Sequence, residues 1–77
     1  MKEVIIYTKT KCPLCDEAKQ VLTIVQEQIP FNLTEVDIYQ DDYLLEKYQL
    51  MIPVVQIDGK EIDYGQVDLD KVWKALE

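Results

Sequence analysis

The run Lys11-Cys12-Pro13-Leu14-Cys15 decides the fold of this chain, because it places the two cysteines of the sequence at the start of a helical pattern. Proline suits the first position of a helix, where its missing N–H would have no partner. Cys12 then lies at the N-cap and Cys15 in the first turn. At that spacing, two sulfur atoms can close a disulfide with little backbone movement.

The flanking residues place the two cysteines between a strand and a helix. Before them, residues 4–8 form an apolar, β-branched run without alternation, which is typical of a strand buried on both faces. After them, apolar residues keep helical spacing as far as Pro30: Ala18, Val21, Leu22, Val25 and Ile29. A second strand over residues 33–38 completes a right-handed βαβ unit, and one of its faces carries Thr34, Val36 and Ile38.

The second half of the chain predicts a short helix, a hairpin and a final helix. Asp41-Asp42 begins the short helix, whose apolar side is supplied by Tyr43, Leu44 and Tyr48. A third strand is expected over residues 54–57, and Asp58-Gly59 predicts a type I′ turn into a returning strand over residues 60–64. Asp68 caps the last helix, whose inner face carries Leu69, Val72, Trp73 and Leu76.

These elements predict an α/β fold in the order βαβαββα, with a four-stranded mixed sheet and helices on both faces. We expect one domain over residues 1–77, because no linker, repeat or low-complexity segment interrupts the pattern. No apolar run approaches the roughly 18 residues that span a membrane, and we find no signal peptide before the first strand. We therefore expect a cytoplasmic, monomeric protein that does not bind a membrane.

The charge pattern argues against nucleic acid as a partner and singles out two lysines. The chain carries a net charge of −7, and its eight basic residues are all lysine. Nucleic-acid binding needs a basic surface, usually with arginine. Lys9 and Lys11 nevertheless stand just before Cys12, where they either bind a substrate or form ordinary solvated surface.

The helix start makes Cys12 the expected nucleophile. A thiolate attacks disulfides, whereas a free thiol with a pKa of about 8.5 is mostly protonated at neutral pH. Unpaired backbone N–H groups and the positive end of the helix dipole favour the thiolate, and Lys9 or Lys11 adds to this effect. Cys15, which points back towards the helix, is expected to resolve the mixed disulfide.

Two other uses of a Cys-x-x-Cys pair fit the sequence less well. Zn²⁺ takes four ligands, and the chain holds no histidine and no third cysteine, so we expect no metal. A structural disulfide across four residues closes a very small loop and stabilises little. The reducing cytoplasm would also tend to break such a disulfide.

Beyond the cysteines, the chain resembles the glutaredoxins along nearly its whole length. The matching runs are Tyr7-Thr8-Lys9, Cys12-Pro13-Leu14-Cys15, Glu35-Val36-Asp37, Ile52-Pro53-Val54 and Ile57-Asp58-Gly59-Lys60. The resemblance implies a thioredoxin-like fold and thiol–disulfide oxidoreductase activity, with a cis peptide bond before Pro53 that faces the active cysteine. From the residues alone, Pro53 could equally be a trans proline that opens an edge strand.

The resemblance also implies a substrate site. The backbone of Ile52 would pair with an incoming peptide or with glutathione as an added strand, and Lys9 would meet a glutathione carboxylate. Besides the catalytic Cys12 and Cys15, we expect substrate contacts from Lys9, Lys11, Pro13, Leu14, Ile52 and Pro53. No tightly bound cofactor is expected, and glutathione would enter only as a co-substrate.

Two departures from the family weaken the link to glutathione. Leu14 stands where glutaredoxins usually carry Tyr or Phe. Glutaredoxins also carry two adjacent glycines after the last strand, and N–H groups there hold the γ-glutamyl carboxylate of glutathione. Here that stretch is Asp63-Tyr64-Gly65, and the carboxylate of Asp63 would repel such an anion. The expected reductant is either glutathione or a flavoprotein of the thioredoxin reductase type.

The expected function is the reduction of protein or low-molecular-weight disulfides by the Cys-Pro-Leu-Cys dithiol. Three alternatives stay open: a redox sensor whose disulfide changes partner affinity, a partner-binding module of the same fold, and an iron–sulfur carrier that uses Cys12. Glutaredoxins that carry clusters favour a single-cysteine motif, so Cys15 counts against the carrier.

Overall fold

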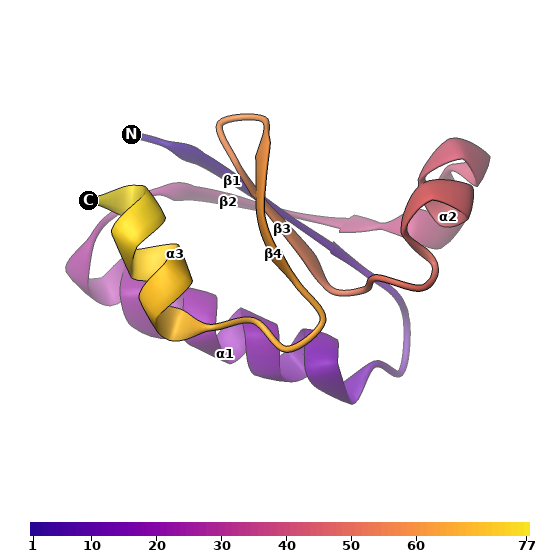
Figure 1. Cartoon of the computed structure of the whole chain (residues 1–77), viewed down its shortest axis with the longest axis horizontal. Helices are drawn as coiled ribbons and strands as arrows, with labels where there is room; N and C mark the ends of the chain where they lie inside the picture. Colours follow the sequence, from indigo (N-terminus) through magenta and orange to yellow (C-terminus); the bar gives the residue numbers. More distant parts are fainter.

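Four strands form one mixed sheet in the spatial order β2-β1-β3-β4 (Figure 1). The computed structural model describes all residues from 1 to 77, and its strands are β1 (Glu3–Thr8), β2 (Asn32–Asp37), β3 (Val54–Ile57) and β4 (Lys60–Tyr64). β1 pairs with β2 in parallel and with β3 antiparallel, and β4 pairs antiparallel with β3. β1 is thus a central strand that is hydrogen-bonded on both edges.

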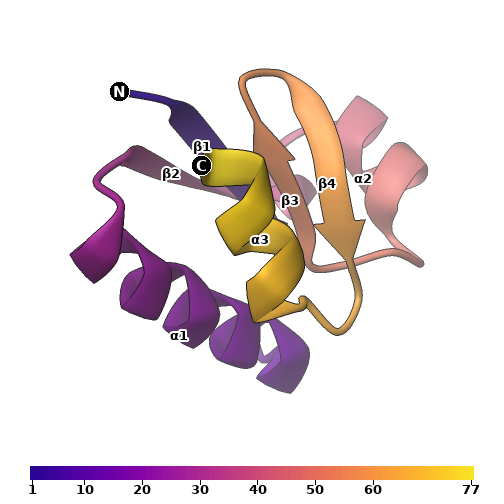
Figure 2. The ribbon, with the colours of Figure 1, turned by 60° about the vertical axis from the view of Figure 1, so that its left-hand side comes forward.

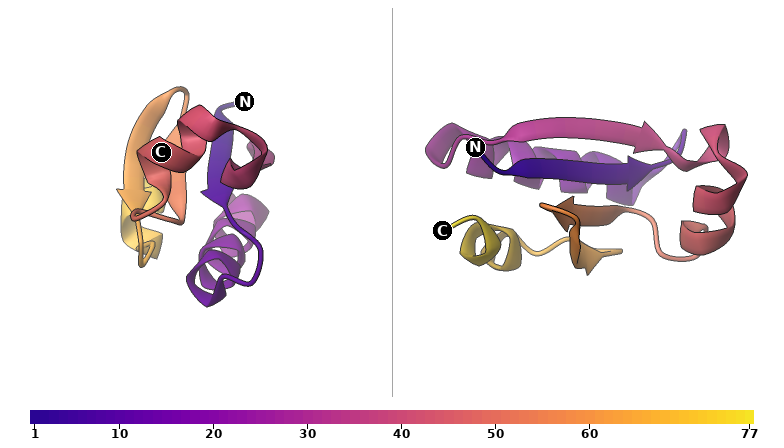
Figure 3. Two further views of the ribbon diagram at one scale, coloured as in Figure 1. Left: turned by 90° about the vertical axis from the view of Figure 1, so that its right-hand side faces the viewer. Right: turned by 90° about the horizontal axis from the view of Figure 1, so that it is seen from above.

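The helical elements are α1 (Pro13–Gln28), the short 3₁₀-helix η1 (Ile38–Gln40), α2 (Asp42–Tyr48) and α3 (Leu69–Leu76). α1 and α3 pack on one face of the sheet (Figure 2), whereas α2 lies at one end of it (Figure 3). The order βαβαββα and the four-stranded mixed sheet confirm the predicted fold class. None of the helices has the length and apolarity needed to span a bilayer.

The main core lies between the sheet and the helices α1 and α3. Alternation along β1 turns Val4 and Ile6 towards this side, and the helical period of α1 turns Leu22 and Val25 to meet them. All four side chains are at most 1% exposed. Fully burying a side chain of this size is worth about 1.5–3 kcal/mol. The apolar stripe predicted for α1 is therefore confirmed.

A smaller core lies on the opposite face, where α2 and η1 cover only the end of the sheet. Its buried members are Tyr7, Ile38, Tyr48 and Val54. The ring centroids of Tyr7 and Tyr48 lie 4.9 Å apart. The hydroxyl of Tyr48 donates to Glu61 Oε1 at 2.7 Å and accepts from Gln56 Nε2 at 3.2 Å. Tyr48 therefore ties α2 to both strands of the β3–β4 hairpin.

Two expectations for this region are wrong. Ile38 begins η1 instead of ending β2, because the Asp37 side chain accepts the N–H of Tyr39 at 2.9 Å and turns the chain. The sequence also predicts Tyr43 on the apolar side of α2, yet its side chain is 68% exposed. A helix of only seven residues offers the sheet one fully buried position, and Tyr48 fills it.

Three further local predictions are confirmed. Asp58 and Gly59 both take positive φ angles, of 50° and 84°, as a type I′ turn requires. Asp68 caps α3 by accepting the N–H of Asp70 at 2.8 Å. Trp73 is half-buried and packs against the main core, so it acts as a core residue.

Replacing Tyr48 by Phe removes one hydroxyl and keeps the ring. We expect the free energy of unfolding at pH 7 to fall by about 1 kcal/mol, since two hydrogen bonds are lost. Burial raises the pKa of Tyr48 above its ordinary value. The tyrosine therefore stabilises the fold fully below about pH 10, and this contribution is lost as the pH rises through the raised pKa. Urea titrations of both proteins should show that the difference between their free energies of unfolding shrinks above pH 10. A difference that stays constant over this pH range would contradict the prediction.

Candidate active site

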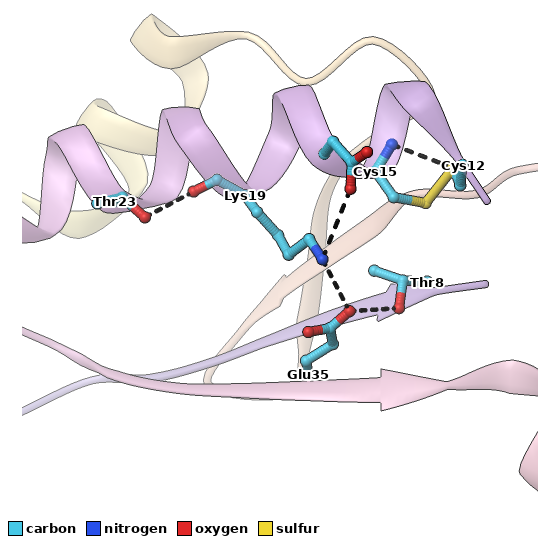
Figure 4. Close-up of polar contacts among 7 residues, drawn as sticks. Thr8, Cys12, Cys15, Lys19, Thr23 and Glu35 are labelled. Carbon is cyan, nitrogen blue, oxygen red and sulfur yellow. Dashed lines mark hydrogen bonds and ion pairs between the residues drawn. A yellow bond between two sulfur atoms is a disulfide. The ribbon is translucent and has the colours of Figure 1, made fainter. Parts of the chain in front are cut away.

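The two cysteines form a disulfide across the first turn of α1 (Figure 4). Cys12 is the N-cap residue, with an extended backbone (φ −123°, ψ 100°), and Pro13 opens the helix as predicted. The Sγ atom of Cys12 accepts the backbone N–H of Cys15 at 3.1 Å, and the two Cα atoms are 5.1 Å apart. The helix start therefore binds the Cys12 sulfur as it would bind an N-cap oxygen.

The two cysteines differ in their exposure. Cys15 is 1% exposed, whereas Cys12 is 8% exposed. Leu14, which lies between them, is 41% exposed and offers an apolar contact at the rim. An attacking or attacked group can reach Cys12 with less rearrangement than it needs to reach Cys15. This difference suits the roles of nucleophile and resolving cysteine that the sequence predicts.

A second segment, Ile52-Pro53, reaches the same end of the sheet from the other half of the chain. The β1–β3 register pairs Tyr7 with Val54, so this segment lies level with the end of β1 from which the cysteine loop starts. The Ile52–Pro53 peptide bond is cis, as the resemblance implies. The Pro53 carbonyl accepts the N–H of Gly65 at 2.8 Å, whereas the N–H and carbonyl of Ile52 form no backbone hydrogen bond.

The loop Lys9-Thr10-Lys11, which joins β1 to the cysteines, is exposed along its length. Neither of its lysines forms an ion pair, in contrast to Lys19 on α1. Lys11 has a φ of 56°, in the left-handed region that residues other than glycine rarely adopt. The loop therefore brings two lysines that form no ion pair close to Cys12, one of them on a strained backbone.

A polar cluster that the sequence analysis missed lies beside this loop (Figure 4). Glu35 Oε2 accepts from the Thr8 hydroxyl at 2.9 Å and from Lys19 Nζ at 3.2 Å. Lys19 also pairs with Asp16 Oδ1 at 3.7 Å. The cluster ties the first two turns of α1 to β1 and β2. No local pattern signals it, because Thr8 and Glu35 stand 27 positions apart and meet only through the parallel register.

The carboxylate of Asp63 is already bonded within the chain. Its Oδ1 accepts the N–H of Tyr64 and its Oδ2 accepts the N–H of Asp68, both at 2.9 Å. Lys71 Nζ lies 3.7 Å from Oδ1, and the Asp63 side chain is only 9% exposed. Asp63 therefore holds the loop between β4 and α3 and occupies a backbone N–H at the start of α3.

Comparisons with known sequences point to one family. A family model described as "Glutaredoxin-like domain (DUF836)" matches residues 3–77. A glutaredoxin-like protein of Dictyostelium discoideum is 32% identical over 77 aligned positions, which cover 92% of this chain and 71% of that protein. The match therefore extends over almost all of the fold described above.

Solved structures share the arrangement of helices and strands. A protein of Nitrosomonas europaea superposes with a TM-score of 0.88 at 24% identity, over 99% of this chain and 92% of that chain. A protein of X. campestris gives 0.80 at 27% identity, over 95% and 93%. A mutant thioredoxin of Halobacterium salinarum gives 0.72 at 18% identity, over 99% and 72%. The superposition on the thioredoxin shows that this chain has a thioredoxin-like fold.

The variants Lys11→Gly and Lys11→Ala remove the same charge but place different demands on the backbone. At the φ of 56° found here, a Cβ atom crowds the following carbonyl oxygen at a cost of about 1–2 kcal/mol, which glycine avoids. We expect the glycine variant to be more stable than the alanine variant by about 1 kcal/mol, the reverse of their order within helices. Chemical denaturation of the oxidised proteins measures the difference, and equal stabilities would show that the loop relaxes.

Proposed function

Because the chain belongs to the glutaredoxin-like family, we propose that it is a dithiol–disulfide oxidoreductase that reduces protein or low-molecular-weight disulfides. One observation carries the proposal: the only two cysteines are joined across the N-terminal turn of α1 in a thioredoxin-like fold. A disulfide across so short a loop adds little to stability. Its position is better suited to chemistry than to reinforcement of the fold.

Cys12 starts the reaction as a thiolate in the reduced protein. The N–H of Cys15, which lies 3.1 Å from the Cys12 sulfur in the disulfide form, and the unpaired N–H of Leu14 in the first turn favour negative charge there. The thiolate attacks one sulfur of the substrate disulfide. The substrate S–S bond breaks, a Cys12–substrate S–S bond forms, and the departing thiolate takes a proton from water.

Cys15 completes the exchange. Its thiol gives up a proton and attacks the Cys12 sulfur, so that the Cys12–Cys15 disulfide forms while the second substrate thiol leaves. Two electrons have then passed to the substrate, and the protein is left in the oxidised form described above. A separate reductant must return two electrons before the next turnover.

A peptide substrate would dock beside Ile52. The N–H and carbonyl of this residue have no backbone partner in the chain and can pair with an extended segment as an added strand. Pro13 is exposed beside Cys12 and Pro53 is buried next to Ile52, so that Pro13 and Leu14 would add the apolar contacts next to Cys12. Strand pairing of this kind uses hydrogen bonds to the substrate backbone, so it is compatible with many substrate sequences.

Glutathione is a poor reductant in this proposal, because the start of α3 already holds carboxylates of the chain itself. Asp63 takes the N–H of Asp68, and Asp68 takes the N–H of Asp70. A γ-glutamyl carboxylate would compete for these amides while meeting the like charge of the aspartates. A flavoprotein of the thioredoxin reductase type, or another protein dithiol, is therefore favoured as the reductant.

A side-by-side assay tests the function and the reductant together. Insulin reduction is followed with dithiothreitol, with glutathione plus glutathione reductase, and with a thioredoxin reductase, and the absorbance spectrum of freshly purified protein is recorded. Turnover with dithiothreitol and with the reductase, but little with glutathione, supports the proposal. Brown protein without turnover would favour the iron–sulfur carrier. If the protein shows neither turnover nor colour, the sensor or the binding module is favoured.

The two cysteine variants should separate the roles in the exchange. Cys12→Ser should abolish disulfide reduction, whereas Cys15→Ser should accumulate mixed disulfides because the resolving thiol is missing. In the reduced wild type, iodoacetamide should label Cys12 first, with half-maximal rate below about pH 8.5. Mass spectrometry locates the adduct. Preferential labelling of Cys15 would reverse the assignment.

Removing the charge of Asp63 should open the start of α3 to glutathione. Asp63→Asn keeps one oxygen acceptor but eliminates the negative charge, so we expect glutathione to bind Cys15→Ser/Asp63→Asn about three- to tenfold more tightly than Cys15→Ser. Calorimetric titration measures both affinities. Asp58→Asn, in the distant hairpin turn, is the matched control. Tight binding by Cys15→Ser itself would restore glutathione as the natural reductant, and no gain on removing the charge would show that Asp63 does not exclude glutathione.

A further inference from the structure

Cys15 must lose its proton before it can resolve a mixed disulfide, and the fold keeps this residue away from water. Cys15 is 1% exposed, against 8% for Cys12. Burial disfavours the charged form of a group, and only the thiolate attacks a disulfide. The resolving step therefore depends on the charges that surround the first turn of α1.

Lys19 is the only cation on α1, and it stands four residues after Cys15. Side chains at this spacing are neighbours on a helix surface, and long side chains lean towards the N-terminus of their helix. In Figure 4 the Lys19 side chain runs back towards the first turn. Its Nζ lies 3.7 Å from Asp16 Oδ1 and 3.2 Å from Glu35 Oε2. Lys19 is thus ion-paired beside the turn that holds Cys15.

The charges around this turn are balanced. A hollow of about 360 Å³ lies beside the turn, and its charged residues are Lys9, Lys11, Asp16, Lys19, Glu35 and Asp37. Three ammonium groups therefore meet three carboxylates. Asp63, on the loop before α3, pairs with Lys71 at 3.7 Å. Without the charge of Lys19, three carboxylates would stand against two ammonium groups, and a thiolate that forms nearby would be repelled.

We propose that Lys19 is a positioning residue for the resolving step: it holds Asp16 and Glu35 in ion pairs and so lets Cys15 lose its proton beside them. The inference rests on the proposed oxidoreductase function and assigns a further residue to it. Thr8 supports the arrangement from the sheet, because its hydroxyl donates to the same Glu35 oxygen at 2.9 Å. Thr8 is itself only 3% exposed, so the carboxylate is held within reach of Lys19.

The effect falls mainly on the second of the two exchanges. In that step the Cys15 thiol gives its proton to water and its sulfur attacks Cys12. The bond between Cys12 and the substrate sulfur breaks, and the departing thiolate takes up a proton. Cys12 ionises at the N-cap, where the N–H of Cys15 meets its sulfur, so it depends less on Lys19. Loss of the Lys19 charge should therefore slow the second exchange more than the first.

A single turnover with excess dithiodipyridine, an uncharged disulfide, separates the two exchanges. The reduced protein releases one thiopyridone when Cys12 attacks and a second when Cys15 resolves the mixed disulfide. Stopped-flow absorbance follows both releases over a range of pH, and mass spectrometry confirms that the product is the Cys12–Cys15 disulfide. In Lys19→Gln the second release should be about three- to tenfold slower at pH 7, because its pH profile moves up by about half to one unit. At high pH the two proteins should reach the same rate, whereas a misfolded variant would be slow at every pH.

Three further variants distinguish a charge effect from a loss of structure. Lys19→Arg keeps the charge and should keep the rate of the second release. Lys19→Gln/Glu35→Gln should recover most of that rate, because two ammonium groups again meet two carboxylates in the hollow. The matched control Lys2→Gln also loses one charge and one ion pair, with Asp58 at 3.7 Å, but at the far end of β1 (Figure 1). Its second release should match that of the wild type.

An unshifted pH profile in Lys19→Gln, or no recovery in Lys19→Gln/Glu35→Gln, would overturn the inference. Failure of the proposed function would be seen separately, as a wild type that reduces no insulin. The shift in the pH profile could still be measured on that protein, because the second release needs only the two cysteines and the reagent.

Discussion

The passage from β1 into α1 is the constraint on which the rest of the molecule depends. β1 is hydrogen-bonded to both β2 and β3 and sends side chains into both cores. After Thr8 the chain has only residues 9–12 in which to leave the sheet and begin a helix that Cys12 caps and whose first turn contains Cys15. This short passage explains the left-handed backbone of Lys11 and the N-cap geometry of Cys12, and it holds two lysines close in sequence to the sulfur atoms.

The features that could be predicted from the sequence depend on residues close together along the chain. The helix start at Pro13, its apolar stripe and the type I′ turn at Asp58-Gly59 each follow from local spacing or backbone preference, and each is present. The end of β2 is also set locally, by the Asp37 side chain that accepts the N–H of Tyr39. The exposure of Tyr43 could not be derived in this way, because it depends on how far the short α2 reaches over the second face of the sheet, which is a property of packing.

The candidate site can be divided in the same way, into residues that the sequence points to and contacts that form only in the folded chain. Spacing alone singles out Cys12 and Cys15, and the family resemblance places Ile52-Pro53 near them. The Thr8–Glu35–Lys19 cluster arises from strand register, and the bonds of Asp63 arise from a loop that folds back on itself. Family membership therefore accounts for the fold and the cysteine pair.

Both chain termini lie at the end of the molecule opposite α2 and the start of α1 (Figure 1). Whatever is joined to either terminus is therefore held away from the sulfur atoms. The domain is accordingly suited to genetic fusion, for example to a fluorescent protein or a surface anchor. The attached body would then lie at the end of the sheet opposite the cysteine pair, and Cys12 and Cys15 would stay accessible to a partner.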